Sequence, residues 1–379
     1  VMQVAIVAAG FTPGEADQLR RAMAAWKRRG GLGPFEERLL EGMRLRGYPA
    51  AFAEQLFRQI RGFGEYGFPE SHAASFALLV YVSAWIKCHA PAAFLAALLD
   101  SQPMGFYAPA QLVRDARLHG VEVRAATVQH SDWGCRLEQA ADGHPAVRLG
   151  LSRVAGFGAE AARRVMTARS AQGAFASVQE LATRAGLARR ELAALAAAGA
   201  LEGLAGHRHR AAWEVAGVEE DLPLFAQPRF NEATPLLRAP TPGENVVADY
   251  RQLGLTLGPH PLQLLRESLS HSGAISAEEM QRLAHGTRVR VAGLVLVRQR
   301  PGTASGVTFI TLEDETGVVN LVVWKRIAAR DRRALVGSRL LWAEGEVQRE
   351  GDVVHVVVRR LRDESVRLGQ LVARSRDFH

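Results

Sequence analysis

The spacing of hydrophobic and polar residues changes along the chain, and its first region has a helical period. Helical spacing of apolar residues is the mark of an amphipathic helix. It is clearest at Phe52, Leu56, Phe57 and Ile60. We predict helices over residues 16–27, 34–46, 50–63, 71–89 and 92–99. Residues 1–104 are therefore expected to form one helical region.

The middle of the chain is mixed in character. In residues 105–204 we predict a helix at 110–119, short strands at 121–124, 133–138 and 146–149, and helices at 159–169, 177–184 and 188–197. Residues 205–285 are rich in proline, which interrupts periodic structure. These prolines are Pro223, Pro228, Pro235, Pro240, Pro242, Pro259 and Pro261. This region is predicted to be mostly a linker that contains short elements.

From about Thr287 the hydrophobic period becomes two, as in strands that bury one face. The predicted strands are 288–298, 307–313, 318–324, 339–348 and 353–360, with a short helix at 327–335. Five strands with a helix after the third are the order of an OB-fold, a small barrel that often binds single strands. The predicted barrel domain is 286–363, and 364–379 is expected to be a tail.

The charge of the chain favours a polyanionic partner. Its 379 residues include 47 Lys and Arg against 39 Asp and Glu, a formal net charge of +8. Nucleic acid fits this balance, and an arginine-rich genome is the alternative explanation. The longest apolar run, 73–86, is too short to span a bilayer, so no membrane is expected. Two cysteines, Cys88 and Cys135, predict a reduced, cytoplasmic chain without a bound metal.

Two segments of the first region carry candidate phosphate-binding residues. The stretch 62–72 contains Gly62, Gly64 and Gly67 followed by a predicted helix start. Glycines permit close approach of a ligand, and a helix N-terminus attracts anions. Tyr66 and His72 are the candidate contacts, and a packed helix–helix turn is the alternative. Arg20 and Arg21 could bind phosphate on the helix 16–27, or they could lie on a solvated face.

A helix-hairpin-helix pattern lies in the second region. Residues 149–158 followed by a helix match it, because a glycine turn lets backbone amides meet a DNA phosphate. Such binding does not read sequence. A second, degenerate unit has its turn at 185–187. The candidate DNA contacts of both units are Gly156, Phe157, Gly158, Arg163, Arg164, Gly186, Arg189 and Arg190. A protein-binding helical hairpin is the alternative.

The linker and the barrel add further candidates. Asp221, Leu222, Leu224 and Phe225 belong to a peptide that resembles the bacterial sliding-clamp motif, although Asp221 replaces its usual Gln. This peptide could equally fold back on its own domain. The candidate DNA contacts of the barrel are Arg288, Arg290 and Lys325. Phe309, Trp324 and Trp342 could stack on bases, with the barrel core the preferred role for most of them. The acidic segment 311–317 is predicted to be a hairpin turn rather than a metal site.

Taken together, these motifs resemble the bacterial C-family DNA polymerases, the DnaE-type alpha subunits. Residues 66–78 and 85–91 resemble the end of the fingers domain of that family, and residues 19–23 resemble its fingers helix. The order that follows is also similar: tandem helix-hairpin-helix units, a linker with a clamp peptide, and an OB-fold. Residues 99–107, and an end soon after the barrel, resemble the error-prone (ImuC) class. The resemblance covers essentially the whole chain, and the start at Val1 suggests a C-terminal fragment.

The resemblance implies a division of roles. Arg20, Arg21, Tyr66 and His72 would contact the incoming nucleotide, and the other motifs would hold the template and primer. Sliding clamp and a Y-family-like accessory protein are the implied protein partners. The catalytic Mg²⁺ ions would be bound outside this chain, because the palm motif Asp-x-Asp does not occur in it. The chain alone is therefore expected to be inactive. A stand-alone DNA-binding module and a clamp-recruiting scaffold are the alternatives.

Overall fold

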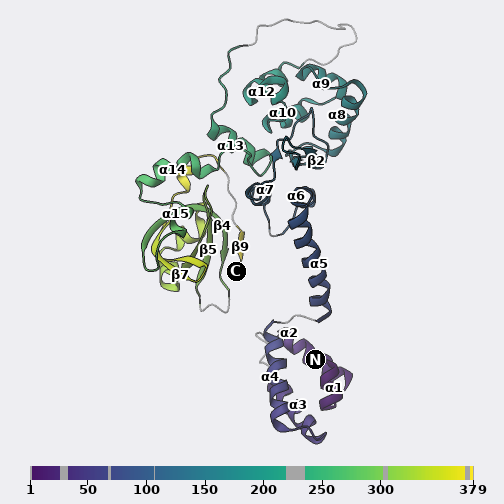
Figure 1. Cartoon of the computed structure of the whole chain (residues 1–379), viewed down its shortest axis with the longest axis vertical. Coiled ribbons are helices and arrows are strands. Elements are labelled where there is room, and N and C mark those ends of the chain that lie inside the picture. The colour runs from purple at the N-terminus through teal and green to yellow at the C-terminus, as the bar shows by residue number, and fades with distance from the viewer. Residues whose placement is uncertain are drawn as a thin grey trace. The chain divides into compact units, whose positions relative to one another are not determined.

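The computed structural model describes residues 2–25, 33–66, 70–105, 107–218, 235–301, 306–371 and 376–378. The chain divides into two compact units, residues 1–86 and 87–379. Figure 1 labels their helices and strands. We describe each unit by itself.

The first unit is helical, as the sequence predicts. It contains α1 (Met2–Ala9), α2 (Pro13–Ala25), α3 (Gly33–Leu45), α4 (Ala50–Tyr66) and most of α5 (Glu70–His89). Its core is built from side chains that include Phe11, Leu19, Leu39, Met43 and Phe57.

Helix α4 runs through Gly62 and Gly64 to Tyr66, whereas the sequence predicted a glycine turn from residue 62. A glycine inside a helix costs only about 1 kcal/mol. Phe57 and Ile60 are buried and anchor the helix just before these glycines.

Helix α5 exposes many large apolar side chains. They are Phe76, Leu78, Leu79, Val80, Tyr81, Val82 and Trp85. Among the described residues, however, no helix combines the length and the apolar character that crossing a bilayer requires, α5 included.

The helical part of the second unit also contains a small sheet. Its elements are α6 (Pro91–Asp100), α7 (Pro109–Leu118), β1 (Val123–Arg124), β2 (Arg136–Gln139), β3 (Pro145–Arg148), the 3-10 helix η1 (Leu151–Arg153), α8 (Ala159–Gln172), α9 (Val178–Ala185), α10 (Arg189–Ala197), α11 (Glu202–Ala205) and α12 (Arg208–Ala216). The sheet order is β1-β3-β2. A shared core contains Leu149, Leu181, Leu192, Leu195 and Leu201. The first and second hairpin units therefore pack as one body.

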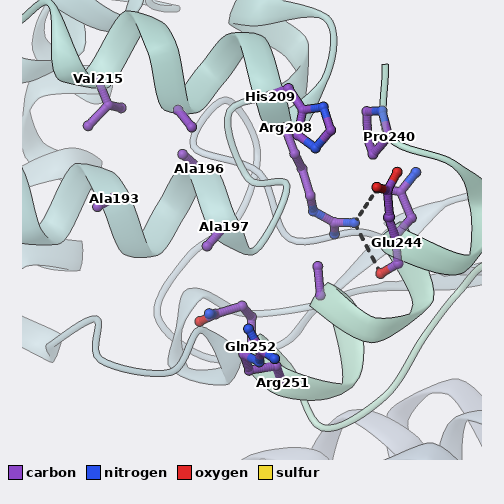
Figure 2. A pocket seen from close by; sticks show the side chains of 13 residues that line it. Ala193, Ala196, Ala197, Arg208, His209, Val215, Pro240, Glu244, Arg251 and Gln252 are labelled. Atoms are coloured by element: carbon purple, nitrogen blue, oxygen red, sulfur yellow. Dashed lines mark hydrogen bonds between the residues drawn. The ribbon is translucent and has the colours of Figure 1, made fainter. Parts of the chain in front are cut away.

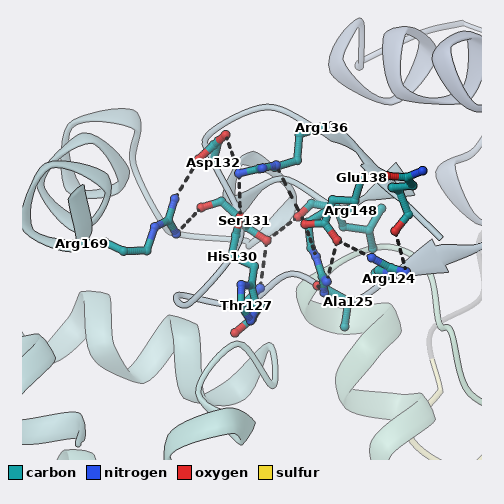
Figure 3. A network of polar contacts seen from close by, with 12 residues as sticks. Arg124, Ala125, Thr127, His130, Ser131, Asp132, Arg136, Glu138, Arg148 and Arg169 are labelled. Atoms are coloured by element: carbon teal, nitrogen blue, oxygen red, sulfur yellow. Dashed lines mark hydrogen bonds and ion pairs between the residues drawn. The ribbon is translucent and has the colours of Figure 1, made fainter. Parts of the chain in front are cut away.

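Arginines surround one carboxylate on this sheet (Figure 3). Glu138 pairs with Arg124 and Arg148 at 2.8 Å each, and with Arg136 at 3.9 Å. Hydrogen bonds from Arg148, and then from Arg124, hold the pKa of Glu138 at about 2, against an ordinary value of 4.5. Each of the three strands contributes one of these arginines, so the carboxylate ties the sheet together.

The proline-rich region is more structured than a linker. Helices α11 and α12 contribute Ala205, Ala211 and Val215 to the helical core. Beyond residue 234 the chain forms α13 (Pro242–Gln252), α14 (Pro261–His271) and α15 (Ala277–Gln281). Pro242 and Pro261 stand at the first position of their helices, where proline fits because the missing N–H has no helical partner. The predicted role of these prolines as interruptions of periodic structure is therefore wrong for 242–281.

The barrel has the predicted topology. It contains β4 (Arg288–Gln299), β5 (Thr308–Glu313), β6 (Val318–Val323), β7 (Leu340–Glu350) and β8 (Val353–Asp363), with α16 (Lys325–Arg330) and α17 (Arg332–Gly337) between β6 and β7. Antiparallel β4–β5 pairing and parallel β6–β8 pairing close the five strands. A further strand, β9 (Arg376–Phe378), pairs with β4 after the 3-10 helix η2 (Ser365–Leu368). The predicted OB-fold is confirmed.

Helix α13 and the residues after it join the helical part to the barrel. Leu253 and Leu255 enter the helical core, while Val246 packs with Leu262 and Trp342 on the barrel side. An ion pair between Arg114 of α7 and Glu313 of β5 adds a direct link. Burial there raises the pKa of Tyr250 to about 12. This connection is thus a packed brace.

The acidic turn after β5 belongs to the same brace. Asp314 accepts hydrogen bonds from the amides of Thr316 and Gly317 within the turn, and from the amide of Ala277 at the start of α15. Arg266 of α14 pairs with Asp314 at 3.0 Å and with Glu315 at 2.5 Å. The segment therefore forms the predicted hairpin turn, and its carboxylates are engaged by a guanidinium and by amides.

We predict that Glu138→Gln destabilises the second unit by about 1–3 kcal/mol at neutral pH, because it leaves the surrounding arginines without their shared anion. The folded pKa lies below the unfolded one, so the stabilisation is present above pH 4.5 and is lost as the pH falls toward 2. Urea unfolding at several pH values measures this. The difference between the variant and the wild type should shrink as the pH falls below 4.5 and vanish only near pH 2. Glu122→Gln, at a more exposed carboxylate on Arg124, is the control and should change little.

Candidate nucleic-acid interface

The first hairpin turn connects η1 to α8 and is fixed at both sides. Phe157 is only 5% exposed and anchors the turn in the helical core. The amide of Ala155 donates to the carbonyl of Gln252, at the end of α13, at 2.8 Å. Gly156 has a φ of +78°, a left-handed conformation that favours glycine. The turn therefore has a defined shape, which depends partly on the brace.

The outer side of this turn is open. Gly156 and Gly158 are exposed, and a Cβ added to either would meet no atom within 4 Å. Within the part of the chain that the structure describes, their amides donate no hydrogen bond. Gly158 is also the N-cap of α8, so the unpaired amides of the first helical turn point the same way. Open donors beside a helix N-terminus suit a phosphate.

Arg163 lies close to this opening on α8. Its side chain is 66% exposed and pairs with Glu160 one turn earlier, and the hydrogen bond from Arg163 holds the pKa of Glu160 below its ordinary value. Exposed pairs of this kind contribute little free energy. Arg163 can therefore turn toward a phosphate at small cost.

The second hairpin turn differs, because its amides are already bonded. Gly186 donates to the carbonyl of Thr183, Leu187 donates to that of Ala182, and Ala188 donates to the Glu191 carboxylate at 2.8 Å. Gly186 was predicted to be a DNA contact, but its amide is bonded to Thr183 and is not open to a phosphate. The C-cap of α9 and the N-cap of α10 are only two residues apart, and their capping hydrogen bonds engage the amides of this turn.

The arginines around the second hairpin turn also differ in whether they are already bonded within the protein. Arg164 of α8, predicted as a DNA contact, instead donates to the carbonyls of Ala185 and Gly186 and pairs with Glu191 at 3.0 Å. Arg189 donates to the carbonyl of Ala216. Arg190 is exposed and, among the described residues, has no recorded partner. Of this set, Arg190 is the residue best placed to reach a phosphate.

The outer face of β5 and β6 presents aromatic side chains. Phe309 is 39% exposed and Trp324 is 55% exposed, whereas Trp342 is buried beneath Arg362. Phe309 stands opposite Val322, so Trp324 is on the same face two residues further along. The core role preferred for these aromatics is correct for Trp342 and wrong for Phe309 and Trp324. The alternation of residues along β5 could have predicted that Phe309 is exposed, because Phe309 lies on the same face of the strand as the polar Thr311.

The basic residues of the barrel lie in two different places. Lys325 follows Trp324 directly and is exposed beside the aromatic face. Arg288 and Arg290 stand on β4 opposite Glu346 and Glu344 of β7, and Arg290 pairs with Glu344 at 3.3 Å. The structure therefore groups Lys325 with the aromatic side chains and places the two arginines in a ladder of mixed charge.

In the first unit, Arg20 and Arg21 are exposed on α2, and both pair with Asp17 at 2.8 Å. The side chains of Tyr66 and His72, and the whole of 221–225, lie outside the described residues.

A cavity of about 290 Å³ lies between α10, α12 and α13. Figure 2 shows alanine side chains on one side of it and Arg208 on another. Arg208 donates to the Asn245 side chain at 2.7 Å and also pairs with Asp249. Its guanidinium thus fastens α13 to the helical core and is already engaged, so it is not available to a ligand in the cavity.

Three family models match separate parts of the chain. A model for the finger domain of the bacterial DNA polymerase III alpha subunit matches residues 1–47, a helix-hairpin-helix model matches 120–211, and a model for an OB-fold nucleic acid binding domain matches 289–364. They fall, in this order, on the helical first unit, on the region of the two hairpin turns and on the barrel.

Whole proteins that resemble the chain match all of it, including the residues outside the three family models. The chain is similar throughout its length to error-prone DNA polymerases. It is 62% identical to the protein so named from Alkalilimnicola ehrlichii, 59% to that of Methylococcus capsulatus and 57% to that of Pseudomonas fluorescens. The matches cover 100% of this chain but only 37–38% of each relative. Among solved structures, asparaginyl-tRNA synthetase from Pyrococcus horikoshii is 27% identical over 24% of this chain and 22% of its own, with a TM-score of 0.21.

We predict that Gly158→Ala weakens binding to a short DNA duplex by about tenfold, with a loss of stability of no more than about 1 kcal/mol, since alanine is a poorer N-cap than glycine. Its φ of −96° accepts alanine, and the new methyl group would occupy the space where a phosphate approaches. Fluorescence anisotropy with a labelled duplex measures the change. Gly337→Ala, which also adds a methyl group in open space but on α17, is the matched control and should bind normally. Equal affinities of the two variants would contradict the assignment.

We predict that Phe309→Leu and Trp324→Leu each weaken binding of single-stranded DNA by about 1–3 kcal/mol, because a base loses its stacking partner. Duplex affinity should stay close to that of the wild type. Trp213→Leu removes a comparably exposed aromatic from α12 and serves as the control. The stacking role is rejected if the control variant loses as much affinity as the other two.

Proposed function

We propose that this chain is the DNA-holding section of an error-prone, DNA-directed DNA polymerase of the translesion (ImuC) class. The observation that carries the proposal is the open turn at Gly156–Gly158 in a chain that is similar over its whole length to error-prone DNA polymerases. The turn would bind backbone phosphates of the primer–template duplex, and the face of Phe309 and Trp324 would receive the single-stranded template. These contacts ignore sequence, as a polymerase requires.

The remaining roles follow the order of the motifs. Arg20 and Arg21 would contact the triphosphate of the incoming dNTP, together with Tyr66 and His72. The peptide 221–225 would recruit the sliding clamp, and a Y-family-like accessory protein would complete the assembly. Cytoplasmic location goes with these partners. The similarity of residues 1–47 to the polymerase III finger domain supports the first of these roles.

Nucleotidyl transfer needs two Mg²⁺ ions held by carboxylates, and this chain does not fit that requirement. It has no Asp-x-Asp motif. At the acidic turn, Asp314 and Glu315 both pair with Arg266, and Asp314 also accepts the amide of Ala277. We therefore expect the ions to be bound by carboxylates outside this chain, and the chain to supply positioning and charge.

Primer extension tests the proposal. A protein of the relatives' full length that contains this chain should extend a primer past a damaged template base. The chain alone should bind the same primer–template and incorporate nothing. Incorporation by the chain alone, or a full-length protein that binds DNA but never extends, would contradict the proposal.

A further inference from the structure

Helix α8, which presents the open turn to solvent, has little apolar packing to aim it. Its fully buried side chains are Ala161, Ala162 and Val165. Small side chains bury little area, and so they fix the direction of a helix weakly. Something else must hold α8 in register with the rest of the domain.

Arginine side chains hold α8 instead. At the C-terminal end of α8, Arg169 donates to the carbonyls of Val128 and Ser131 and pairs with Asp132 at 2.8 Å. Arg184 of α9 reaches back to the carbonyl of Ala168 at 2.8 Å. These contacts hold the end of the helix that is far from the open turn.

The end near the open turn is held by Arg164. Its guanidinium contacts the carbonyls of Ala185 and Gly186 in the second turn, and also both oxygens of Glu191 at 3.0 Å. Glu191 in turn accepts the Ala188 amide and so caps α10. Arg164 is therefore bonded to the end of α9 and the start of α10 at once. Its side chain is only 32% exposed.

We infer that Arg164 is a positioning residue that fastens α8 to the closed second hairpin turn. This contact holds the Gly156–Gly158 amides in the geometry that binds a phosphate. The tandem units thus have different tasks, since one turn binds and the other supports. This inference rests on the proposed function of the first turn. It also separates Arg164 from its neighbour Arg163, which is exposed, pairs only with the exposed Glu160, and can turn to meet the phosphate directly.

The inference is tested by combining Arg164→Gln with Gly158→Ala and measuring duplex affinity for each single variant and for the double. Arg164→Gln should weaken binding about three- to tenfold alone and far less in the Gly158→Ala background, because both changes act on the same turn. Losses that multiply in the double variant would overturn the inference. An Arg164→Gln variant that binds like the wild type would overturn it as well.

The salt dependence separates positioning from direct contact. Each phosphate contact contributes about −0.9 to the slope of log affinity against log salt. Arg163→Gln should make the slope shallower by about one such contact. Arg164→Gln should leave the slope unchanged while speeding hydrogen exchange at the amide of Ala162, which is buried and bonded to the carbonyl of Gly158 in the first turn of α8. A shallower slope for Arg164→Gln would assign it to the phosphate and end the inference. If the wild type binds no duplex at all, the proposed function fails instead.

Discussion

A backbone amide that is not bonded inside a protein must find water or another acceptor, and this constraint governs the helical part of the second unit. The turn at Gly156 and Gly158 leaves its donors facing outward next to the start of α8. The related turn at Gly186 bonds each of its donors internally and closes with Glu191. Two segments of similar sequence character therefore present opposite surfaces, and the difference lies in the acceptors nearby.

The same constraint accounts for the arginines. Carbonyls at helix ends and in turns need donors, and guanidinium groups supply them: Arg164 bonds the carbonyl of Gly186 at the end of α9, and Arg169 bonds that of Val128 in a turn. Much of the positive charge in this part of the chain is thus used to hold helices together. The groups left for a polyanion are fewer than the composition suggests: they include the exposed Arg190, and Arg163 beside the open turn, which is held only by an exposed pair with Glu160. Net charge alone overstates the interface.

Much of the fold follows from the sequence, because strand alternation and helical spacing record which faces are buried. The barrel strands and the first glycine turn could be placed that way. The prolines of 242–281 misled because a proline at a helix start and a proline in a loop look alike in sequence. The exposed positions of Phe309 and Trp324 required the pairing of β5 with β6. The partner of Arg164 lies 27 residues away, and no local pattern announces such a contact.

Hydrogen exchange on the intact chain, measured with and without a short DNA duplex, addresses the open turn most directly. Slower exchange on adding duplex is predicted at the amides of Gly156, Gly158 and the first turn of α8, with no change at Gly186, Leu187 and Ala188. Protection of both turns alike, or of neither while the duplex is bound elsewhere, would contradict the claim that one open glycine turn grips the DNA backbone.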